Sequence, residues 1–177
     1  MTEDPRTQVE IRGLLQTDAC KKFRSGHEAL DVFLRCHAAK NQFRFSISST
    51  YVAVVAANVI GYATITAGTI NPRLVPSVTG DKLPSYKLVP VLLLARMAVA
   101  REFQRQTIGA QLLSRVCNLS LEMTSKFGCI GVTVDAKPDA VSYYKTYGFE
   151  PIPKTPEETE ARSTNTLMFL HHDTIAD

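Results

Sequence analysis

Residues 89–116 read VPVLLLARMAVAREFQRQTIGAQLLSRV, a long apolar run followed by a polar turn and an amphipathic stretch. The run at 91–100 shows almost no alternation of polar and apolar residues, which is typical of a buried strand. From residue 108 onward apolar side chains recur at helical spacing, and Gly128 stands where a helix would end. The expected buried face consists of Ile108, Leu112, Leu113, Val116, Leu119, Met123 and Phe127. The stretch therefore predicts a buried strand, a turn and a helix.

The turn between this strand and helix has a composition that suits an anion. The first N–H groups of a helix lack intrahelical acceptors and carry partial positive charge. Arg101 and Arg105 add cationic side chains, and Gly109 and Ala110 let a ligand come close to the backbone. A pyrophosphate would suit this turn. Glycine and arginine also occur in turns that only cap a helix, so the spacing alone leaves both interpretations open.

The rest of the chain predicts further strands and helices. Ser25 is the expected cap of the first helix, ahead of Glu28, and Ala57-Asn58 is the expected turn of a hairpin. Residues 68–90 hold four prolines and predict a long loop, a kind that is more often functional than idle. Strands are expected at 9–15, 49–68 (the hairpin), 91–100, 129–136 and 165–172, and helices at 27–43, 108–127 and 138–148. This order predicts a mixed α/β fold in one domain, residues 1–177.

The composition is that of a globular protein, and its charge is unevenly distributed. Of the 177 residues, 45% are hydrophobic and 21% charged, with a net charge of +3. Between Lys21 and Arg44 the balance is +4, and from Glu150 to the end it is −4. The basic residues of the first segment are Lys21, Lys22, Arg24, Arg35, Lys40 and Arg44. Such asymmetry favours a face for a polyanion, although two differently solvated surfaces would give the same pattern.

No pattern in the sequence predicts a metal site or a disulfide. The cysteines Cys20, Cys36, Cys117 and Cys129 form no C-x-x-C pair, which favours free thiols in a reducing compartment. His171 and His172 are adjacent and would point to opposite faces of a strand. The N-terminus lacks the features of a signal peptide, and no apolar segment is long enough to span a membrane. A cytoplasmic protein is expected.

The turn and a second motif resemble the GNAT superfamily of acetyl-CoA-dependent N-acetyltransferases. Gln104 and Gly109 match the first and last positions of the family's motif Q/R-x-x-G-x-G/A, whereas Thr107 stands where glycine is usual. A β-branched residue resists the positive φ that glycine adopts there, although its hydroxyl could donate to a phosphate. DAVSYYKTYGFEPIP is similar to the family's A-x-x-F-Y-x-x-x-G-F segment, with Ala140, Tyr143, Tyr144, Gly148 and Phe149 in register.

The first half of the chain resembles one branch of this family, the acetyltransferase toxins of toxin–antitoxin pairs. Ser25 replaces the cysteine of that branch's pattern F-x-C-G-x-x-x-L-D-x-F/W-L, which leads into A-x-x-N-Q. The matching positions are Phe23, Gly26, Leu30, Asp31, Phe33, Leu34, Ala38, Asn41 and Gln42. PSYKLVPVLLLARMAV is similar to the branch's P-x-x-x-P-x-x-x-L-x-R-L-A-V. The resemblance extends from about Phe23 to Pro151.

This resemblance implies a fold, a cosubstrate and roles for particular residues. It implies a GNAT-like mixed sheet in which the fourth and fifth strands splay apart. Acetyl-CoA would contact Met97, Ala98, Val99, Gln104, Arg105, Gln106, Thr107, Ile108, Gly109 and Ala110. The N–H of Val99 would stabilise the oxyanion, and Tyr144 would donate to the departing thiolate, a role that Tyr143 or Tyr147 could also fill. Direct transfer is implied, so Cys117 and Cys129 are not expected to carry an acyl group.

The branch further implies an acceptor and partners. The acceptor would be the α-amine of aminoacyl-tRNA, bound by the basic residues between Lys21 and Arg44, and its acetylation would inhibit translation. A ribbon-helix-helix antitoxin and a homodimer would be the protein partners. Two alternatives stay open: a GNAT enzyme for a small amine or a protein amine, and a non-catalytic sensor that binds acetyl-CoA. Nothing in the sequence singles out the general base.

Overall fold

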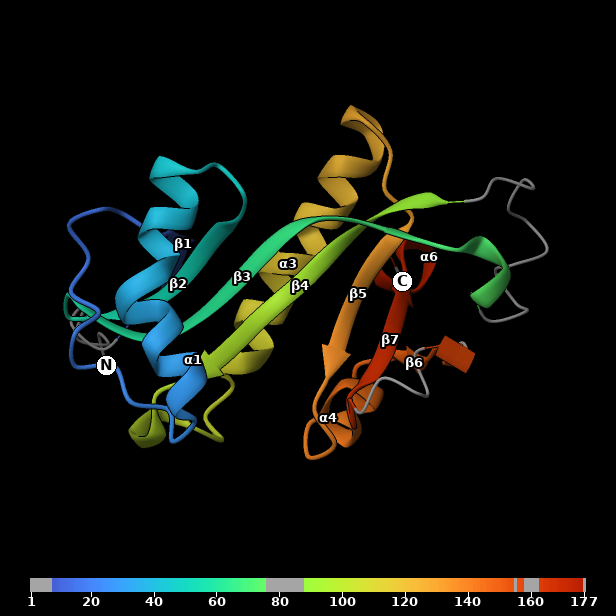
Figure 1. Ribbon diagram of the computed structural model, residues 1–177. Coiled ribbons are helices and arrows are strands. Elements are labelled where there is room, and N and C mark those ends of the chain that lie inside the picture. The colour runs from blue at the N-terminus through green and yellow to red at the C-terminus, as the bar shows by residue number, and fades with distance from the viewer. Residues whose placement is uncertain (1–7, 76–87, 155, 158–162, 177) are drawn as a thin grey trace, which may run out of the picture. The chain divides into compact units, whose positions relative to one another are not determined.

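A computed structural model shows a mixed sheet flanked by helices and describes residues 8–75, 88–154, 156–157 and 163–176 (Figure 1). The strands are β1 (Glu10–Gly13), β2 (Ser49–Val55), β3 (Asn58–Ile70), β4 (Val89–Val99), β5 (Gly131–Ala136), β6 (Glu150–Pro151) and β7 (Thr166–His171). The α-helices are α1 (Glu28–Val32), α3 (Ile108–Lys126), α4 (Val141–Thr146) and α6 (His172–Ala176). Short helical turns are η1 (Phe33–His37), η2 (Lys40–Arg44), η3 (Pro72–Leu74) and η4 (Arg101–Phe103).

The seven strands are arranged in the order β1-β2-β3-β4-β5-β7-β6. β4 and β5 are parallel, whereas β2 is antiparallel to β1 and β3, and β7 to β5 and β6. This confirms the expected mixed α/β sheet. The chain forms two compact units: unit 1 is Met1–Thr66 with Ala95–Val116, and unit 2 is Ala67–Leu94 with Cys117–Asp177. The single domain stays a prediction.

The core of unit 1 is built by the first helical segment against the strands. Phe33, Leu34 and Ala38 are buried with Val52, Val54, Val59 and Tyr62. The expected helix at 27–43 is present, but only its first turn is α-helical. The N–H of Ala38 donates to the carbonyl of Phe33, and that of Phe45 to the carbonyl of Lys40, so the later turns are π-helical. π-helical turns often occur at functional sites.

The close approach of α3 to β3 depends on Gly61. A Cβ atom at this position would lie 3.1 Å from Ile108 Cγ2 and 3.1 Å from Leu112 Cδ1. Both partners are buried and belong to the first turns of α3. The missing side chain therefore lets the start of the helix, and the turn before it, sit directly against the strand.

The second half of the chain contains the expected strands β4, β5 and β7 and the expected helices α3 and α4. The ladder of β4 with β5 pairs Leu92–Leu94 with Val132–Val134. Splaying of the two strands beyond Leu94 stays a prediction. Gly128 adopts φ +90 after α3, as a helix-ending glycine should. The assignment of Phe127 to the buried face is wrong, because α3 ends at Lys126 and the Phe127 side chain is 66% exposed.

The proline-rich loop expected at 68–90 is shorter than predicted. β3 continues to Ile70 and β4 already begins at Val89, because the apolar residues flanking the prolines join the sheet. Asn71 caps η3 by accepting the N–H of Arg73 at 3.0 Å. Residues 76–87, the centre of that stretch, lie outside the described residues. Among the helices that the structure describes, none combines the length and apolarity that a membrane crossing requires.

The hairpin between β2 and β3 turns one residue earlier than expected. Ala56 and Ala57 link the strands with φ of 48 and 65, so both residues lie in the left-handed region. Two consecutive left-handed residues form a type I′ turn, whose twist matches that of the flanking strands. Alanine is a poor residue for this conformation, because its Cβ crowds the backbone there.

We expect Ala57→Gly to raise the free energy of unfolding by about 1 kcal/mol, because glycine adopts positive φ without that penalty. The matched control is Ala39→Gly, an exposed alanine in helical conformation (φ −64). There glycine should lower the stability by about 0.5–1 kcal/mol. Urea unfolding of both variants measures the difference, and a destabilised Ala57→Gly protein would contradict the turn assignment.

Candidate active site

The turn that leads from β4 into α3 has an unusual backbone. Arg105 and Thr107 have φ of 62 and 69, so left-handed residues alternate with others in this turn. Arg105, Gln106 and Thr107 are exposed. Turns in which left-handed residues alternate with others direct successive N–H groups to one side and form anion-binding concavities. The expected anion site therefore has suitable backbone geometry.

Thr107 keeps the conformation of the glycine that it replaces. A threonine at φ 69 is strained, because Cβ and its branches crowd the backbone. Two contacts to Gln111 hold it in place. The Gln111 N–H donates to the Thr107 carbonyl at 3.0 Å, and its side-chain amide donates to Thr107 Oγ1 at 3.3 Å. The departure from the glycine pattern thus leaves the turn intact.

The N–H groups in and after this turn are available to a ligand. In the described structure no hydrogen bond is donated by the N–H of Arg105, Gln106 or Thr107. Ile108, Gly109 and Ala110 form the first turn of α3, where N–H groups have no partner four residues earlier. The turn therefore offers a continuous row of donors to a phosphate.

Gln104 shapes this turn with its side chain. Its Nε2 donates to the carbonyl of Ser25 at 2.8 Å and to the carbonyl of Val99 at 2.9 Å. Both amide hydrogens are thereby used within the protein. Gln104 therefore shapes the turn before α3 by joining it to the end of β4 and to the loop before α1.

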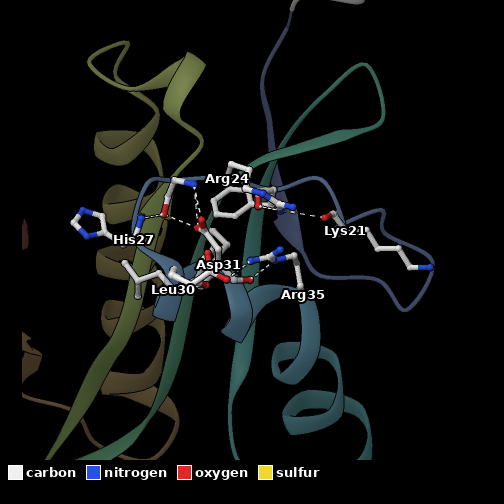
Figure 2. A network of polar contacts seen from close by, with 10 residues as sticks. Lys21, Arg24, His27, Leu30, Asp31 and Arg35 are labelled. Carbon is white, nitrogen blue, oxygen red and sulfur yellow. Dashed lines mark hydrogen bonds and ion pairs between the residues drawn. The ribbon is translucent and has the colours of Figure 1, made fainter.

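That loop is held by a buried carboxylate, which the sequence did not single out (Figure 2). Asp31 is 2% exposed and accepts hydrogen bonds from the N–H of Ser25, at 2.9 and 3.1 Å, and from its hydroxyl. The assignment of Ser25 as helix cap is wrong, because His27 precedes the helix and Ser25 Oγ accepts the His27 N–H. Asp31 matches a position of the toxin-branch pattern, and this match is the feature of the sequence that could have identified it.

The end of β4 presents the backbone of Val99 away from β3. The N–H of the next residue, Ala100, donates to the carbonyl of Ile60 at 2.7 Å. Successive N–H groups of a strand point in opposite directions, so the N–H of Val99 faces the other side. Ala98 is buried in the core of unit 1, and Met97 and Val99 are half-buried. This orientation suits the expected role of Val99 as a backbone donor.

Tyr144 belongs to α4 in unit 2, and its side chain is buried. Its ring packs edge-on against Tyr143, at 5.3 Å between centroids, and against Phe149, at 5.4 Å. Burial raises the pKa of Tyr144 to about 12. The phenol therefore stays protonated at neutral pH and can donate. Tyr147 is 40% exposed, and the hydroxyl of Tyr143 is buried without a partner in the described structure.

The basic residues near the N-terminus differ in whether their charged groups already contact other groups of the protein. Arg24 donates to the carbonyls of Lys21 and Phe23, and Arg35 pairs with Glu28 at 3.1 Å (Figure 2). Arg44 lies over the ring of Phe45. Lys21, Lys22 and Lys40 are exposed, and within the described residues their ammonium groups have no partner. The lysines are therefore the better candidates for contacts with a polyanion.

Cys117 and Cys129 have the environment of structural residues. Burial raises the pKa of Cys117 to about 11, so its thiolate is scarce at neutral pH. Cys129 is buried, and its thiol donates to the carbonyl of Gly131. Neither is suited to act as a nucleophile.

Comparisons with known proteins agree with this geometry. The family model described as acetyltransferase (GNAT) domain matches residues 21–169. A tRNA-acetylating toxin from Mycobacterium tuberculosis (strain ATCC 25618 / H37Rv) is 28% identical over 146 residues, which are 82% of this chain and 86% of the toxin. AtaT in complex with acetyl-methionyl-tRNAfMet superposes with a TM-score of 0.83 at 27% identity, over 96% of this chain and 98% of AtaT. AtaTR bound with acetyl-CoA gives 0.77 at 26%, over 95% and 96%.

We expect Asp31→Asn to lower the free energy of unfolding by about 1–3 kcal/mol. The neutral side-chain amide makes weaker hydrogen bonds than the carboxylate, and its NH₂ group, itself a donor, would replace one oxygen that now accepts the Ser25 N–H. Asp139→Asn, at an exposed position, is the control and should change stability by less than about 0.5 kcal/mol. Urea unfolding measures both. Equal effects of the two substitutions would contradict the anchoring role of Asp31.

Proposed function

This chain belongs to the GNAT acetyltransferase domain family, and from that premise we propose that it transfers the acetyl group of acetyl-CoA to the α-amine of aminoacyl-tRNA. The observation that carries the proposal is the turn before α3, where Thr107 keeps a glycine-like φ of 69 and the N–H groups of Arg105–Thr107 donate to no other described residue. Acetylation of that amine would block its use in peptide synthesis. The protein would thus inhibit translation as the toxin of a toxin–antitoxin pair.

Backbone groups of unit 1 would hold acetyl-CoA. The N–H groups from Arg105 to Ala110 suit its pyrophosphate. In other phosphate sites the anion is likewise bound by successive backbone N–H groups of a turn and by the N-terminus of the following helix. The backbone of Met97–Val99 suits the pantetheine arm, which can pair like another strand. Acetyl-CoA supplies an activated thioester. The polar side chains of the turn are exposed, so the cosubstrate can approach from solvent.

Two donors would serve the chemical step. The N–H of Val99 would stabilise negative charge that develops on the carbonyl oxygen. The Tyr144 hydroxyl would donate to the departing sulfur. With its pKa near 12, the phenol is a weaker acid than an ordinary thiol at ~8.5, so a hydrogen bond to the thiolate is favoured over complete proton transfer.

The toxin homologue and the AtaT complex support tRNA as the acceptor. The first is a tRNA-acetylating toxin, and the second is AtaT bound to acetyl-methionyl-tRNAfMet; both are similar to this chain over most of its length. The exposed lysines Lys21, Lys22 and Lys40, whose ammonium groups pair with no other described residue, would meet phosphates of the acceptor.

An antitoxin is the proposed protein partner. The AtaTR structure is a similar protein bound with acetyl-CoA, and AtaT has been solved with the C-terminus of the antitoxin AtaR. For this chain we infer an antitoxin of the ribbon-helix-helix class, as the toxin-branch resemblance implies. A homodimer also stays a prediction. A small reading frame next to the gene, encoding a ribbon-helix-helix protein, would support the pairing.

We expect the purified protein to transfer label from acetyl-CoA to total charged tRNA, and Tyr144→Phe to lower turnover by about 10²- to 10³-fold. The reason is the loss of one donor to the sulfur, while the ring contacts of Tyr144 remain. Affinity for acetyl-CoA, measured by calorimetry, should stay near the wild-type value. Tyr147→Phe, on the same helical segment but exposed, is the matched control and should keep its activity.

The outcomes separate the alternatives. Labelling of small amines or of protein amines, with every charged tRNA untouched, would replace the tRNA acceptor by the second class of GNAT substrate. Acetyl-CoA binding without transfer to any amine would favour a sensor. Normal turnover of Tyr144→Phe would move the donor role to another group, with Tyr143 the next to test.

We expect Lys21→Gln, Lys22→Gln and Lys40→Gln combined to weaken tRNA binding and to reduce the slope of log affinity against log salt by roughly 2, at about 0.7 per lost phosphate contact. Lys126, Lys137 and Lys154, all exposed in unit 2, give the control triple variant with the same change in net charge. Filter binding at several salt concentrations measures both. An equal loss in the two triple variants would show a nonspecific effect of charge.

A further inference from the structure

The helical segment that begins with α1 ends in five consecutive exposed residues, three of which have large apolar side chains. Phe43, Phe45 and Ile47 are 40%, 52% and 59% exposed, and Arg44 and Ser46 between them are exposed as well. Exposed apolar side chains that occur together, with polar residues beside them, mark interaction sites. Residues 43–47 are called the aromatic turn below.

Hydrogen bonds fix the backbone of the aromatic turn. The Phe45 N–H donates to the carbonyl of Lys40, and the Ile47 N–H donates to that of Asn41, each at 3.0 Å. The carbonyl of Ile47 accepts the hydroxyl of Thr66 at 2.8 Å. The exposed rings are therefore presented from an ordered backbone, which lowers the entropic cost of binding a partner.

The charge around the aromatic turn is positive. Residues 32–80 of the sequence contain no aspartate or glutamate, whereas Lys40 and Arg44 both belong to η2. In the segment after β1, the Asp18 carboxylate is already bound by Arg12, at 2.8 Å to each oxygen. A second copy of this chain that docked through the same surface would bring the same positive charge. The surface therefore favours a negatively charged partner.

The side chains of the aromatic turn have the chemistry that unpaired nucleotides require. Arg44 lies between Phe43 and Phe45 in the sequence, and its guanidinium is over the Phe45 ring, 5.4 Å from the centroid. Unpaired bases stack on exposed aromatic rings, and their phosphates pair with cations. A guanidinium over a ring still offers N–H groups to a phosphate. Among negatively charged partners, single-stranded nucleic acid fits this combination.

The aromatic turn lies at the end of unit 1 that is away from the turn before α3. The N–H of Ala100, just after β4, donates to Ile60, whereas Ile47 is bonded to Thr66 farther along β3. The rise of about 3.3 Å per strand residue places Ile60 and Thr66 roughly 20 Å apart. Figure 1 shows the helical segment of unit 1 running between these two ends. A contact at the aromatic turn is therefore remote from the end of β4.

We propose that the aromatic turn binds unpaired nucleotides of the RNA acceptor, with Phe43 and Phe45 stacking on bases and Arg44 contacting a phosphate. This inference rests on the proposed function, which supplies the RNA. It adds a binding surface beyond the residues that the sequence indicated, because those were selected by charge alone. Since the contact is remote from the reacting groups, it stabilises the bound RNA equally before and during the chemical step.

A fluorescent reporter tests the stacking directly. The chain contains no tryptophan, so Phe45→Trp introduces a single indole that can still stack on a base. We expect its emission to be quenched on titration with deacylated tRNA and with a single-stranded oligoadenylate. Phe127→Trp is the matched control, at a phenylalanine that is 66% exposed in unit 2, and its emission should stay constant. Neither titration involves acetyl transfer.

Affinity measurements separate stacking from charge. Phe45→Ala should weaken binding of deacylated tRNA by roughly 5- to 150-fold, the value of one stacked base. Phe45→Leu, which is apolar but has no aromatic face, should lose nearly as much, whereas Phe45→Tyr should bind like the wild type. None of these changes should alter the salt dependence, but Arg44→Gln should reduce the slope of log affinity against log salt by about 0.7. Phe127→Ala is the control and should bind normally.

Steady-state kinetics and urea unfolding complete the test. With charged tRNA as the substrate, Phe45→Ala should raise KM and leave kcat unchanged, as expected for a contact that acts on binding alone. Because the Phe45 side chain is exposed, all variants should unfold at the wild-type urea concentration.

The outcomes distinguish this proposal from the proposed function. A wild type that binds and acetylates tRNA, with equal affinity in Phe45→Ala, would overturn the stacking role and leave the acetyl transfer intact. A wild type that binds no RNA would remove the RNA acceptor and this proposal with it. Self-association of the wild type in sedimentation, lost in Phe45→Ala without loss of RNA affinity, would show that a second copy covers the aromatic turn and would also overturn the proposal.

Discussion

The candidate site depends on one buried carboxylate, that of Asp31. A buried charge is strongly destabilising unless hydrogen bonds satisfy it. Asp31 gains those bonds from the N–H and hydroxyl of Ser25. The same loop then supplies two carbonyls to the segment between β4 and α3: the carbonyl of Ser25 accepts the Gln104 side-chain amide, and that of Arg24 accepts the N–H of Arg101. The shape of the turn before α3 is therefore set by a side chain about seventy positions earlier in the sequence.

The turn itself is held in a conformation that its sequence disfavours. A residue other than glycine in the left-handed region costs roughly 1–2 kcal/mol, and branching at Cβ adds to this. Thr107 remains there because Gln104 fixes one side of the turn and Gln111 the other. Both anchors lie within unit 1. Within the described residues, the N–H groups of Arg105, Gln106 and Thr107 donate to no acceptor. A turn with glycine at position 107 would present the same groups, so the threonine does not remove the donors.

Local patterns in the sequence predicted most of the fold and the location of the turn. The apolar run of β4, the periodicity of α3 and the glycines after α3 and α4 are local signals, and each predicted its element. Contacts between distant residues were not predictable in the same way. Gln104 and Ser25 are 79 positions apart, and no periodicity links them. The partners of the basic residues are also non-local information: Arg24 donates to a neighbouring carbonyl and Arg35 pairs with Glu28, which only the folded chain reveals, and the polyanion face stays a prediction.

Two residues of unit 1 have environments that their side chains disfavour. Asp31 is a carboxylate in the core, and Thr107 is a branched residue at positive φ. Departures of this kind lower stability and are expected mainly where function requires them. Asp31 holds the loop before α1, and Thr107 belongs to a turn whose N–H groups donate no hydrogen bond within the described residues. Acyl transfer needs such preorganised donors, because donors already oriented toward developing charge need no reorganisation during the reaction.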